Sequence, residues 1–311
     1  MRVPFRGVRE REAVLVRGPL GWGEFSPFVE YADLEAARWL AAAVEAGWHG
    51  WPAAVRTQVP VNATVPALPA DQVAGVLARF AGCTTAKVKV AEAGQVLADD
   101  VSRVAAVREV LGAGGRVRID ANAAWSVDDA VRALTALAPY DLEYAEQPCA
   151  SVAELAALRV ALARAGLDVL VAADESVRKA DDPLRVALAG AADVVVLKVA
   201  PLSGVATALA VAQACGLPVV VSSALDTSVG ISAGVALAAA LPSLPYACGL
   251  GTTSLMAADV ADLPVVDGAL PVRPVVPDPD RIAALAAPPD RQAWWRARAR
   301  RCHALLQESG A

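Results

Sequence analysis

The stretch Ala86-Lys-Val-Lys-Val90 is a short apolar run that carries two lysines, Lys87 and Lys89. Four later runs have the same form, because each is a short, mostly apolar stretch that ends on one charged residue. Counted from position 89, the steps between these residues are 31, 26, 28 and 24. A strand, a helix and two loops together need about 30 residues. Each charged residue therefore marks the same point in a repeated strand–helix unit. The four residues are Asp120, Glu146, Asp174 and Lys198.

Eight strand candidates alternate with helix candidates between residues 58 and 254. Many are rich in valine, as expected for parallel strands buried on both faces. The alternation predicts an α/β fold with a parallel sheet, and eight units predict closure into a (β/α)8 TIM-type barrel. An open doubly wound sheet fits less well, because active groups end at least five successive strands and no Gly-x-Gly-x-x-Gly motif follows the first. The expected strands are 59–65, 86–90, 116–120, 142–146, 169–174, 193–198, 218–222 and 246–249, and the expected helices are 71–80, 95–111, 126–138, 151–165, 181–189, 203–215 and 228–240.

The two ends of the chain do not follow this rhythm. Residues 1–57 combine an alternating stretch, a turn-rich stretch at 18–24 and an amphipathic helix pattern at 33–45. These patterns predict a small α+β capping domain. Residues 58–254 form the predicted barrel. Residues 255–311 are expected to return and to pack on both the cap and the barrel.

Composition excludes several classes of protein. The chain has 311 residues, 56% of them apolar, which is enough for a barrel with a smaller appendage. Its net charge is −5, so no general basic field points to nucleic acid or to an anionic membrane. Its five cysteines form no Cys-x-x-Cys pair, no signal peptide is recognisable, and no segment reaches the roughly 20 apolar residues of a membrane helix. We expect a cytoplasmic protein with a small-molecule carboxylate substrate. Its oligomeric state is open, and a monomer is possible.

The charged strand ends predict a metal site with lysines beside it. Side chains at positions i and i+2 of a strand share a face, so Lys87 and Lys89 should point together into the mouth of the barrel. Two buried lysines require nearby anions, which three carboxylates from neighbouring strand ends would supply. Without His or Cys nearby, such carboxylates suit a hard cation and favour Mg²⁺. The predicted metal ligands are Asp120, Glu146 and Asp174.

The same arrangement predicts removal of a proton alpha to a carboxylate. Lys89 and Lys198 fall on opposite sides of the acids in barrel order, so a bound substrate would have one amine on each face. A metal and an ammonium group stabilise the resulting enediolate where its charge develops. The base must be a neutral amine, although free lysine titrates near pH ~10.4. The metal and Lys87 are therefore expected to lower the pKa of Lys89.

The ordered series Lys-x-Lys, Asp-x-Asn, Glu-Gln-Pro, Asp-Glu-Ser and Lys resembles the enolase superfamily, in its muconate lactonising-like branch, over nearly the whole chain. Gly21-Trp-Gly-Glu24 resembles the cap loop of these proteins. The resemblance implies a Mg²⁺-dependent enzyme with a lysine base. Within the superfamily, further segments are similar to the o-succinylbenzoate synthase family; they are residues 5–11, 21–31, 60–65, 197–202, 222–226 and 249–259.

This resemblance implies a dehydration in menaquinone synthesis, a reaction of the hydro-lyase class. A hydroxycyclohexadiene carboxylate bearing a succinyl chain would lose water and become aromatic. Lys89 would take the alpha proton and deliver it to the departing hydroxide. Lys87 would help to hold the carboxylate, and Lys198 would lie against the other face of the ring as a cation–π partner.

Weaker signals surround this core. Asn122 shares a strand face with Asp120, two serines end the seventh strand, and a Gly-Thr pair follows the eighth. The serines would bind the succinyl carboxylate, and the Gly-Thr pair would offer a backbone donor. A structural serine pair and an ordinary loop turn at Asn122 explain the same residues equally well. The predicted substrate-binding residues are Asn122, Ser222, Ser223, Gly251 and Thr252.

Three other hypotheses are compatible with parts of this pattern. An N-succinylamino acid racemase or a dipeptide epimerase would use Lys89 and Lys198 as two facing bases. A class I aldolase would form a Schiff base at Lys198, but its mechanism does not need the three acids. A non-catalytic barrel would be expected to lack a base or a ligand, and here every position is filled.

Overall fold

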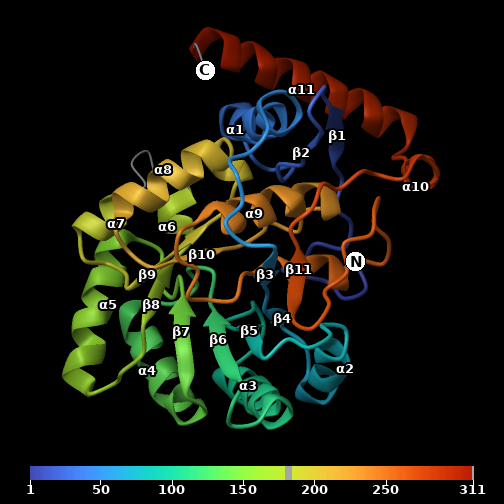
Figure 1. The fold of residues 1–311 in the computed structure, drawn as a ribbon. Coiled ribbons are helices and arrows are strands. Elements are labelled where there is room, and N and C mark those ends of the chain that lie inside the picture. The colour runs from blue at the N-terminus through green and yellow to red at the C-terminus, as the bar shows by residue number, and fades with distance from the viewer. Residues whose placement is uncertain (179–183, 310–311) are drawn as a thin grey trace.

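The structure is a computed structural model that describes residues 1–178 and 184–309. Its centre is a curled sheet of seven parallel strands in the order β10-β9-β8-β7-β6-β5-β4, with helices outside it (Figure 1). The predicted parallel sheet and barrel-like α/β fold are thus confirmed. The strands are β4 (Ala63–Val65), β5 (Thr85–Lys89), β6 (Arg116–Asp120), β7 (Leu142–Glu146), β8 (Val171–Ala173), β9 (Val194–Leu197) and β10 (Val219–Val221).

Helices follow these strands in turn, as the alternating pattern predicts. Of the expected helix 181–189, residues 181–183 lie outside the described residues. The α-helices are α2 (Val73–Leu77), α3 (Leu97–Leu111), α4 (Val127–Leu137), α5 (Val152–Ala165), α6 (Glu175–Arg178), α7 (Arg185–Leu188), α8 (Val205–Cys215) and α9 (Ser228–Ala240). Short 3-10 helices are η2 (Ala70–Gln72), η3 (Ala138–Tyr140), η4 (Ala200–Leu202) and η5 (Gly251–Leu255).

The first and last predicted barrel strands differ from expectation. Residues 59–65 are divided into β3 (Gln58–Pro60) and β4, and β3 pairs antiparallel with β11 (Ala269–Pro271). Pro60 limits the pairing because its nitrogen has no proton to donate. Residues 246–249 contain only two isolated parallel bridges, from Cys248 to Val61 and from Gly249 to Ser222. The chain turns into η5 directly afterwards, so the segment touches both edges of the sheet through one residue each.

A smaller unit lies over one end of the sheet (Figure 1). It contains the antiparallel pair β1 (Val14–Arg17) and β2 (Trp22–Phe25), helix α1 (Asp33–Val44) and the π-helix η1 (Glu45–His49). Strand β2 occupies a stretch that the sequence predicts as turns.

The C-terminal helices are α10 (Pro279–Ala284) and α11 (Pro289–Ser309), and α11 lies along α1 (Figure 1). The rings of Phe25 and Trp295 meet edge to face, with centroids 5.8 Å apart. With Trp39 they belong to one buried apolar cluster, so both ends of the chain contribute to the same core.

The register of the sheet sets the level of the charged side chains. Lys89 in β5 pairs with Asp120 in β6, and Asp120 pairs with Glu146 in β7. Asp174 and Lys198 come directly after the last residues of β8 and β9. The strands bring all five residues to the carboxyl ends of the sheet. No helix within residues 1–178 and 184–309 has the length and apolar character needed to cross a membrane.

Candidate active site

A cavity of about 290 Å³ opens at the carboxyl ends of the strands. Most of the predicted site residues lie in its wall. Glu146 and Asp174 do not line it and are almost fully buried, at 1% and 0% exposure. Gly251 does not line it either, because it is packed in η5 against the carbonyl of Asn62. The predicted residues that line the cavity are Lys87, Lys89, Asp120, Asn122, Lys198, Ser222, Ser223 and Thr252.

Two lysines from β5 hold the first two carboxylates. The Lys87 ammonium donates to both oxygens of Glu146, at 2.8 and 2.9 Å, and lies 3.2 Å from Asp120 Oδ2. Lys89 Nζ donates to the same Asp120 oxygen at 2.5 Å. Both lysines are only 6% exposed. The alternation of β5 therefore turns both amines to one face, as predicted from the Lys-x-Lys pattern.

Asn122 lies beside the second of these lysines. Its Oδ1 accepts a hydrogen bond from Lys89 Nζ at 2.8 Å, and its Nδ2 donates to Glu175 Oε1 at 3.2 Å. The loop after β6 is fixed by the Asn122 backbone N–H, which donates to Asp120 Oδ1 at 3.0 Å. Asn122 thus joins the end of β6 to Glu175, which follows β8 two strands away in the sheet, and to the Lys89 amine.

The third acid, Asp174, follows β8 and is held by the lysine that follows the neighbouring strand β9. Lys198 Nζ donates to Asp174 Oδ2 at 2.5 Å. The Gln147 side chain accepts hydrogen bonds from the backbone N–H groups of Asp174 and Ser176, at 2.9 and 3.2 Å. Gln147 is fully buried and positions the end of β8 from the end of β7. Sequence reasoning included it in the Glu-Gln-Pro motif without a role.

Burial and neighbouring charges give the two β5 lysines different proton affinities. Burial lowers the pKa of Lys89, and repulsion from Lys87 acts in the same direction. The sequence predicts the direction and the part of Lys87, but not the larger effect of burial. Burial also opposes the charge on Lys87, but the carboxylates of Glu146 and Asp120 outweigh it and raise its pKa. Lys89 is therefore the amine that loses its proton more readily.

The pKa values of two of the carboxyl groups, Glu146 and Asp120, are shifted in opposite directions. Burial, reinforced by repulsion from Asp120, raises the pKa of Glu146 to about 7. Burial also acts against the charge of Asp120, but the ammonium groups of Lys89 and Lys87 outweigh it and lower the pKa of that carboxyl.

The predicted metal ligands fit a hard cation by their chemistry. Asp120, Glu146 and Asp174 are three carboxylates at the ends of the consecutive strands β6, β7 and β8, each at most 1% exposed. In the described arrangement each accepts from a lysine, and no three His, Cys, Asp or Glu side chains of residues 1–178 and 184–309 converge closely enough to hold a metal. A divalent cation would take over from these ammonium groups as the counter-charge.

Several wall residues were not predicted. The N-terminal segment supplies Phe5, Arg6 and Val8, and the smaller unit supplies aromatic side chains. The sequence signal for most of them was that they belong to the stretches that resemble the o-succinylbenzoate synthases or, for Glu175, to the Asp-Glu-Ser motif. The remaining unpredicted residues are Phe28, Glu30, Tyr31, Trp39, Thr64, Glu175, Pro201, Ala224, Leu225 and Gly249.

Known proteins resemble this chain over nearly its whole length. Residues 69–277 match the family described as enolase C-terminal domain-like, and residues 1–47 match enolase N-terminal domain-like. An o-succinylbenzoate synthase of Mycolicibacterium smegmatis is 61% identical over 98% of this chain and 94% of that protein. One from Thermobifida fusca is 59% identical over 96% and 92%. The chain belongs to the enolase superfamily, in the family of the o-succinylbenzoate synthases.

Solved structures of the enolase superfamily agree on the fold. The muconate lactonizing enzyme of Pseudomonas putida superposes with a TM-score of 0.71 over 89% of this chain and 99% of that chain, at 19% identity. The resemblance to the superfamily stated from the sequence is confirmed.

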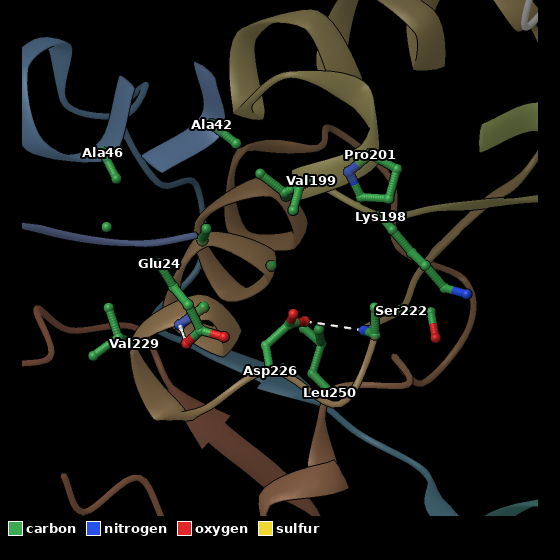
Figure 2. A pocket seen from close by; sticks show the side chains of 16 residues that line it. Glu24, Ala42, Ala46, Lys198, Val199, Pro201, Ser222, Asp226, Val229 and Leu250 are labelled. Carbon is green, nitrogen blue, oxygen red and sulfur yellow. Dashed lines mark hydrogen bonds between the residues drawn. The ribbon is translucent and has the colours of Figure 1, made fainter. Parts of the chain in front are cut away.

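A second cavity, of about 30 Å³, lies beside Lys198 and Ser222 in this enolase-superfamily chain (Figure 2). Glu24 from β2 reaches it and accepts hydrogen bonds at the start of α9, from the Thr227 hydroxyl at 2.5 Å and from the Gly230 N–H at 3.0 Å. Asp226 accepts from the backbone N–H of Ala224 at 3.0 Å (Figure 2). Burial and repulsion from Asp226 raise the pKa of Glu24 to about 7.

Helix α8 is held in a similar way. The Glu45 carboxylate accepts from the backbone N–H groups of Val205 and Ala206, at 2.6 and 2.9 Å. Gly204 makes room for it, because a Cβ there would lie 2.5 Å from Glu45 Oε2. Two glutamates near the N-terminus thus cap the helices that follow Lys198 and Ser222, the helix ends where a negative charge is most stabilising.

Proposed function

We propose that this protein is a Mg²⁺-dependent hydro-lyase that forms o-succinylbenzoate, a step of menaquinone biosynthesis. The substrate is a hydroxycyclohexadiene carboxylate with a succinyl chain, which loses water and becomes aromatic. The observation that carries the proposal is that the buried amine of Lys89 and the partly buried amine of Lys198 line one cavity next to three buried carboxylates. The names of relatives at 56–61% identity support the substrate.

Lys89 is the proposed base. Its pKa is lowered, which is the direction that a base requires, and as the neutral amine it would remove the proton alpha to the substrate carboxylate. The carbon–oxygen bond then breaks, and Lys89 returns the proton to the departing hydroxide, which leaves as water. Because its pKa is raised, Lys87 stays an ammonium and stabilises the carboxylate and the developing dianion. Lys198 supplies a cation at the opposite face of the ring.

Asp120, Glu146 and Asp174 are the proposed ligands of Mg²⁺. When bound, the cation supplies positive charge beside the substrate carboxylate, where negative charge accumulates in the reaction. Three carboxylates at consecutive strand ends, with no His or Cys among them, support a hard cation over zinc.

Three hydroxyl-bearing wall residues, Ser222, Ser223 and Thr252, are proposed to hold the succinyl chain. Ser222 lines the cavity, and Ser223 shares a hydrogen bond of 2.9 Å with the Thr252 hydroxyl. A hydroxyl group can rotate its proton toward a carboxylate, and the proton of Ser223 would then leave the carbonyl of Gly249, to which it donates at 2.8 Å.

We also infer the finer organisation of the fold. Residues 248–249 act as an eighth strand that closes the barrel, which their bridges to Val61 and Ser222 support. The proposed domains are a cap (1–57), the barrel (58–254) and a C-terminal segment (255–311) that packs on both. The β11–β3 pairing and the contact of α11 with α1 support that division.

A second candidate function uses the same cavity. Because Lys89 and Lys198 both line it, an N-succinylamino acid racemase or dipeptide epimerase would have its two bases in place. The test is to incubate the parent and a Lys89→Ala variant with both kinds of substrate and Mg²⁺ in deuterated water. We expect dehydration by the parent to be the faster reaction and to disappear in the variant. A faster deuterium exchange into the amino acid would favour the racemase, and full dehydration by the variant would exclude Lys89 as the base.

A further inference from the structure

The N-terminal hairpin enters the wall of the cavity next to the proposed base. Phe5 and Val8 exchange two backbone hydrogen bonds, at 3.1 and 2.9 Å. Between them, Arg6 and Gly7 have φ angles of 49° and 76°. Two left-handed residues in succession form the tight turn of a two-residue hairpin. Arginine is uncommon in that region of φ, so the side chain of Arg6 must be held by contacts that offset the backbone cost.

The guanidinium of Arg6 reaches three strand-end groups. Its Nε donates to Asn122 Oδ1 at 2.9 Å, its Nη1 donates to Glu92 Oε2 at 2.9 Å, and its Nη2 donates to the carbonyl of Val90 at 2.9 Å. A weaker contact runs from Nη2 to the carbonyl of Asp120 at 3.4 Å. Protein acceptors therefore occupy most of its five N–H groups, which leaves little capacity to bind a substrate carboxylate.

These contacts decide the orientation of the Asn122 amide. Its Oδ1 accepts from Arg6 Nε and from Lys89 Nζ, so both lone pairs of that oxygen are used. Its Nδ2 faces the carboxylate of Glu175. The reversed amide would place an NH₂ group against two cations and an oxygen against a carboxylate. Arg6 thus holds the amide oxygen toward Lys89.

The fixed oxygen in turn fixes the amine. Lys89 Nζ donates to Asn122 Oδ1 at 2.8 Å. Asn122 is not one of the proposed metal ligands, so this hydrogen bond remains when a cation takes over from Lys89 as the counter-charge of Asp120. As a neutral amine, Lys89 has one lone pair, and the bond to Asn122 sets the direction in which that lone pair can face a substrate in the cavity. The Phe5 ring lies 5.1 Å from Nζ and limits its movement on the hairpin side.

We propose that Arg6 is a positioning residue that acts through Asn122 to aim the lone pair of Lys89 at the alpha carbon of the substrate. This inference rests on the proposed function, because it takes Lys89 as the base. It assigns to the hairpin at residues 5–8 a role in turnover rather than in substrate affinity.

The test is a double-mutant cycle measured on the holoenzyme with Mg²⁺ and the dehydration substrate. Arg6→Ala is expected to lower kcat by about a hundredfold and to leave KM unchanged. A misplacement of a reacting group by about 1 Å has an effect of this size on the rate. Asn122→Ala is expected to lower kcat to a similar extent. Because Arg6 acts through Asn122, the double variant should be no slower than Asn122→Ala alone.

Arg2→Ala is the matched control. Arg2 lies on the same segment and donates to the carbonyl of Met256 at 2.8 Å, outside the cavity wall. We expect it to leave kcat at the parent value. As a second readout, added methylguanidinium should restore part of the kcat of Arg6→Ala and none of that of Asn122→Ala.

Three outcomes would overturn the inference. A rise in KM with unchanged kcat in Arg6→Ala would make Arg6 a substrate ligand. Independent, additive losses in the double variant would mean that Arg6 does not act through Asn122. An unchanged kcat in Arg6→Ala would exclude any role in turnover. Failure of the proposed function itself is distinguishable, because the parent protein would then not dehydrate the substrate.

Discussion

Glu24 Oε2 accepts a hydrogen bond of 3.0 Å from the backbone N–H of Gly230, in the first turn of α9. A Cβ at position 230 would lie only 2.9 Å from the Glu24 carboxyl carbon. Strand β2 and helix α9 therefore approach as closely as a residue without a side chain allows. Since α9 follows the serines of the cavity wall, this contact links the smaller N-terminal unit to the site.

Adding one methyl group at this contact should disturb it. Gly230→Ala is expected to lower the free energy of unfolding by about 1 to 3 kcal/mol, because the new atom overlaps Glu24 and Asp226 in a packed region. Gly75→Ala in α2 is the control, since a Cβ there meets nothing within 4 Å. It should be neutral or stabilising by up to about 1 kcal/mol. Equal losses in both variants, measured by urea unfolding, would contradict the close approach.

Stability should depend on pH through Glu24. Its pKa is raised from 4.5 to about 7, mainly by burial, so the folded state binds this proton more tightly than the unfolded state. The stabilisation is complete below pH 4.5 and is lost as the pH rises through about 7, with a slope of at most about 1.4 kcal/mol per pH unit.

The Glu24→Gln variant should reduce the slope of that part of the stability profile, because glutamine does not titrate; the slope that remains is expected from Glu146, whose pKa is also raised to about 7. The measurement is the free energy of urea unfolding of parent and variant between pH 4.5 and 8. Glu109→Gln, an exposed glutamate of α3, should keep the parent profile. Parallel profiles for parent and Glu24→Gln would show that Glu24 does not carry the dependence.

Glu45 should stabilise α8 from outside that helix. Glu45→Ala removes the acceptor for the N–H groups of Val205 and Ala206, and we expect a loss of about 0.5 to 2 kcal/mol, as for other helix caps. Hydrogen exchange should locate the effect, with faster exchange at Val205 and Ala206. Unchanged exchange there, with a loss of stability elsewhere, would place the role of Glu45 outside helix capping.

Removal of divalent cations should separate activity from folding. With EDTA we expect turnover to disappear and to return when excess Mg²⁺ is added. The far-UV circular dichroism and the unfolding midpoint should change little, because lysines can balance the three buried carboxylates. Full activity in EDTA would contradict the proposed metal, whereas unfolding in EDTA would contradict the charge balance.

The sequence predicts the part of the site that lies on regular strands. Charged residues that end apolar runs can be counted, and the parallel register then brings Lys89, Asp120 and Glu146 to one level. Alternation along β5 likewise predicts that Lys87 and Lys89 share a face. These features follow from the spacing of charged and apolar residues along the chain, which can be read from a single sequence.

Contacts made between distant irregular segments were not predictable in this way. Arg6 meets Asn122 across 116 positions through a two-residue turn. Glu45 caps a helix that begins 160 positions later. Neither contact corresponds to a periodic pattern in the sequence, because each depends on how distant helices, strands and loops pack together. The predicted strands at 59–65 and 246–249 were wrong in extent for a related reason, since pairing partners at the edges of the sheet decide where a ladder stops.

The edge-to-face contact of Phe25 with Trp295 has a consequence for synthesis of the protein. During translation, residue 25 emerges from the ribosome long before residue 295 is added. Until the last helix emerges, the nascent N-terminal unit keeps Phe25 and Trp39 without their final cover. The core that Phe25 and Trp39 share with α11 is therefore completed only after residue 295 has been added. Transiently exposed apolar surface of this kind is prone to aggregation, which chaperones counteract.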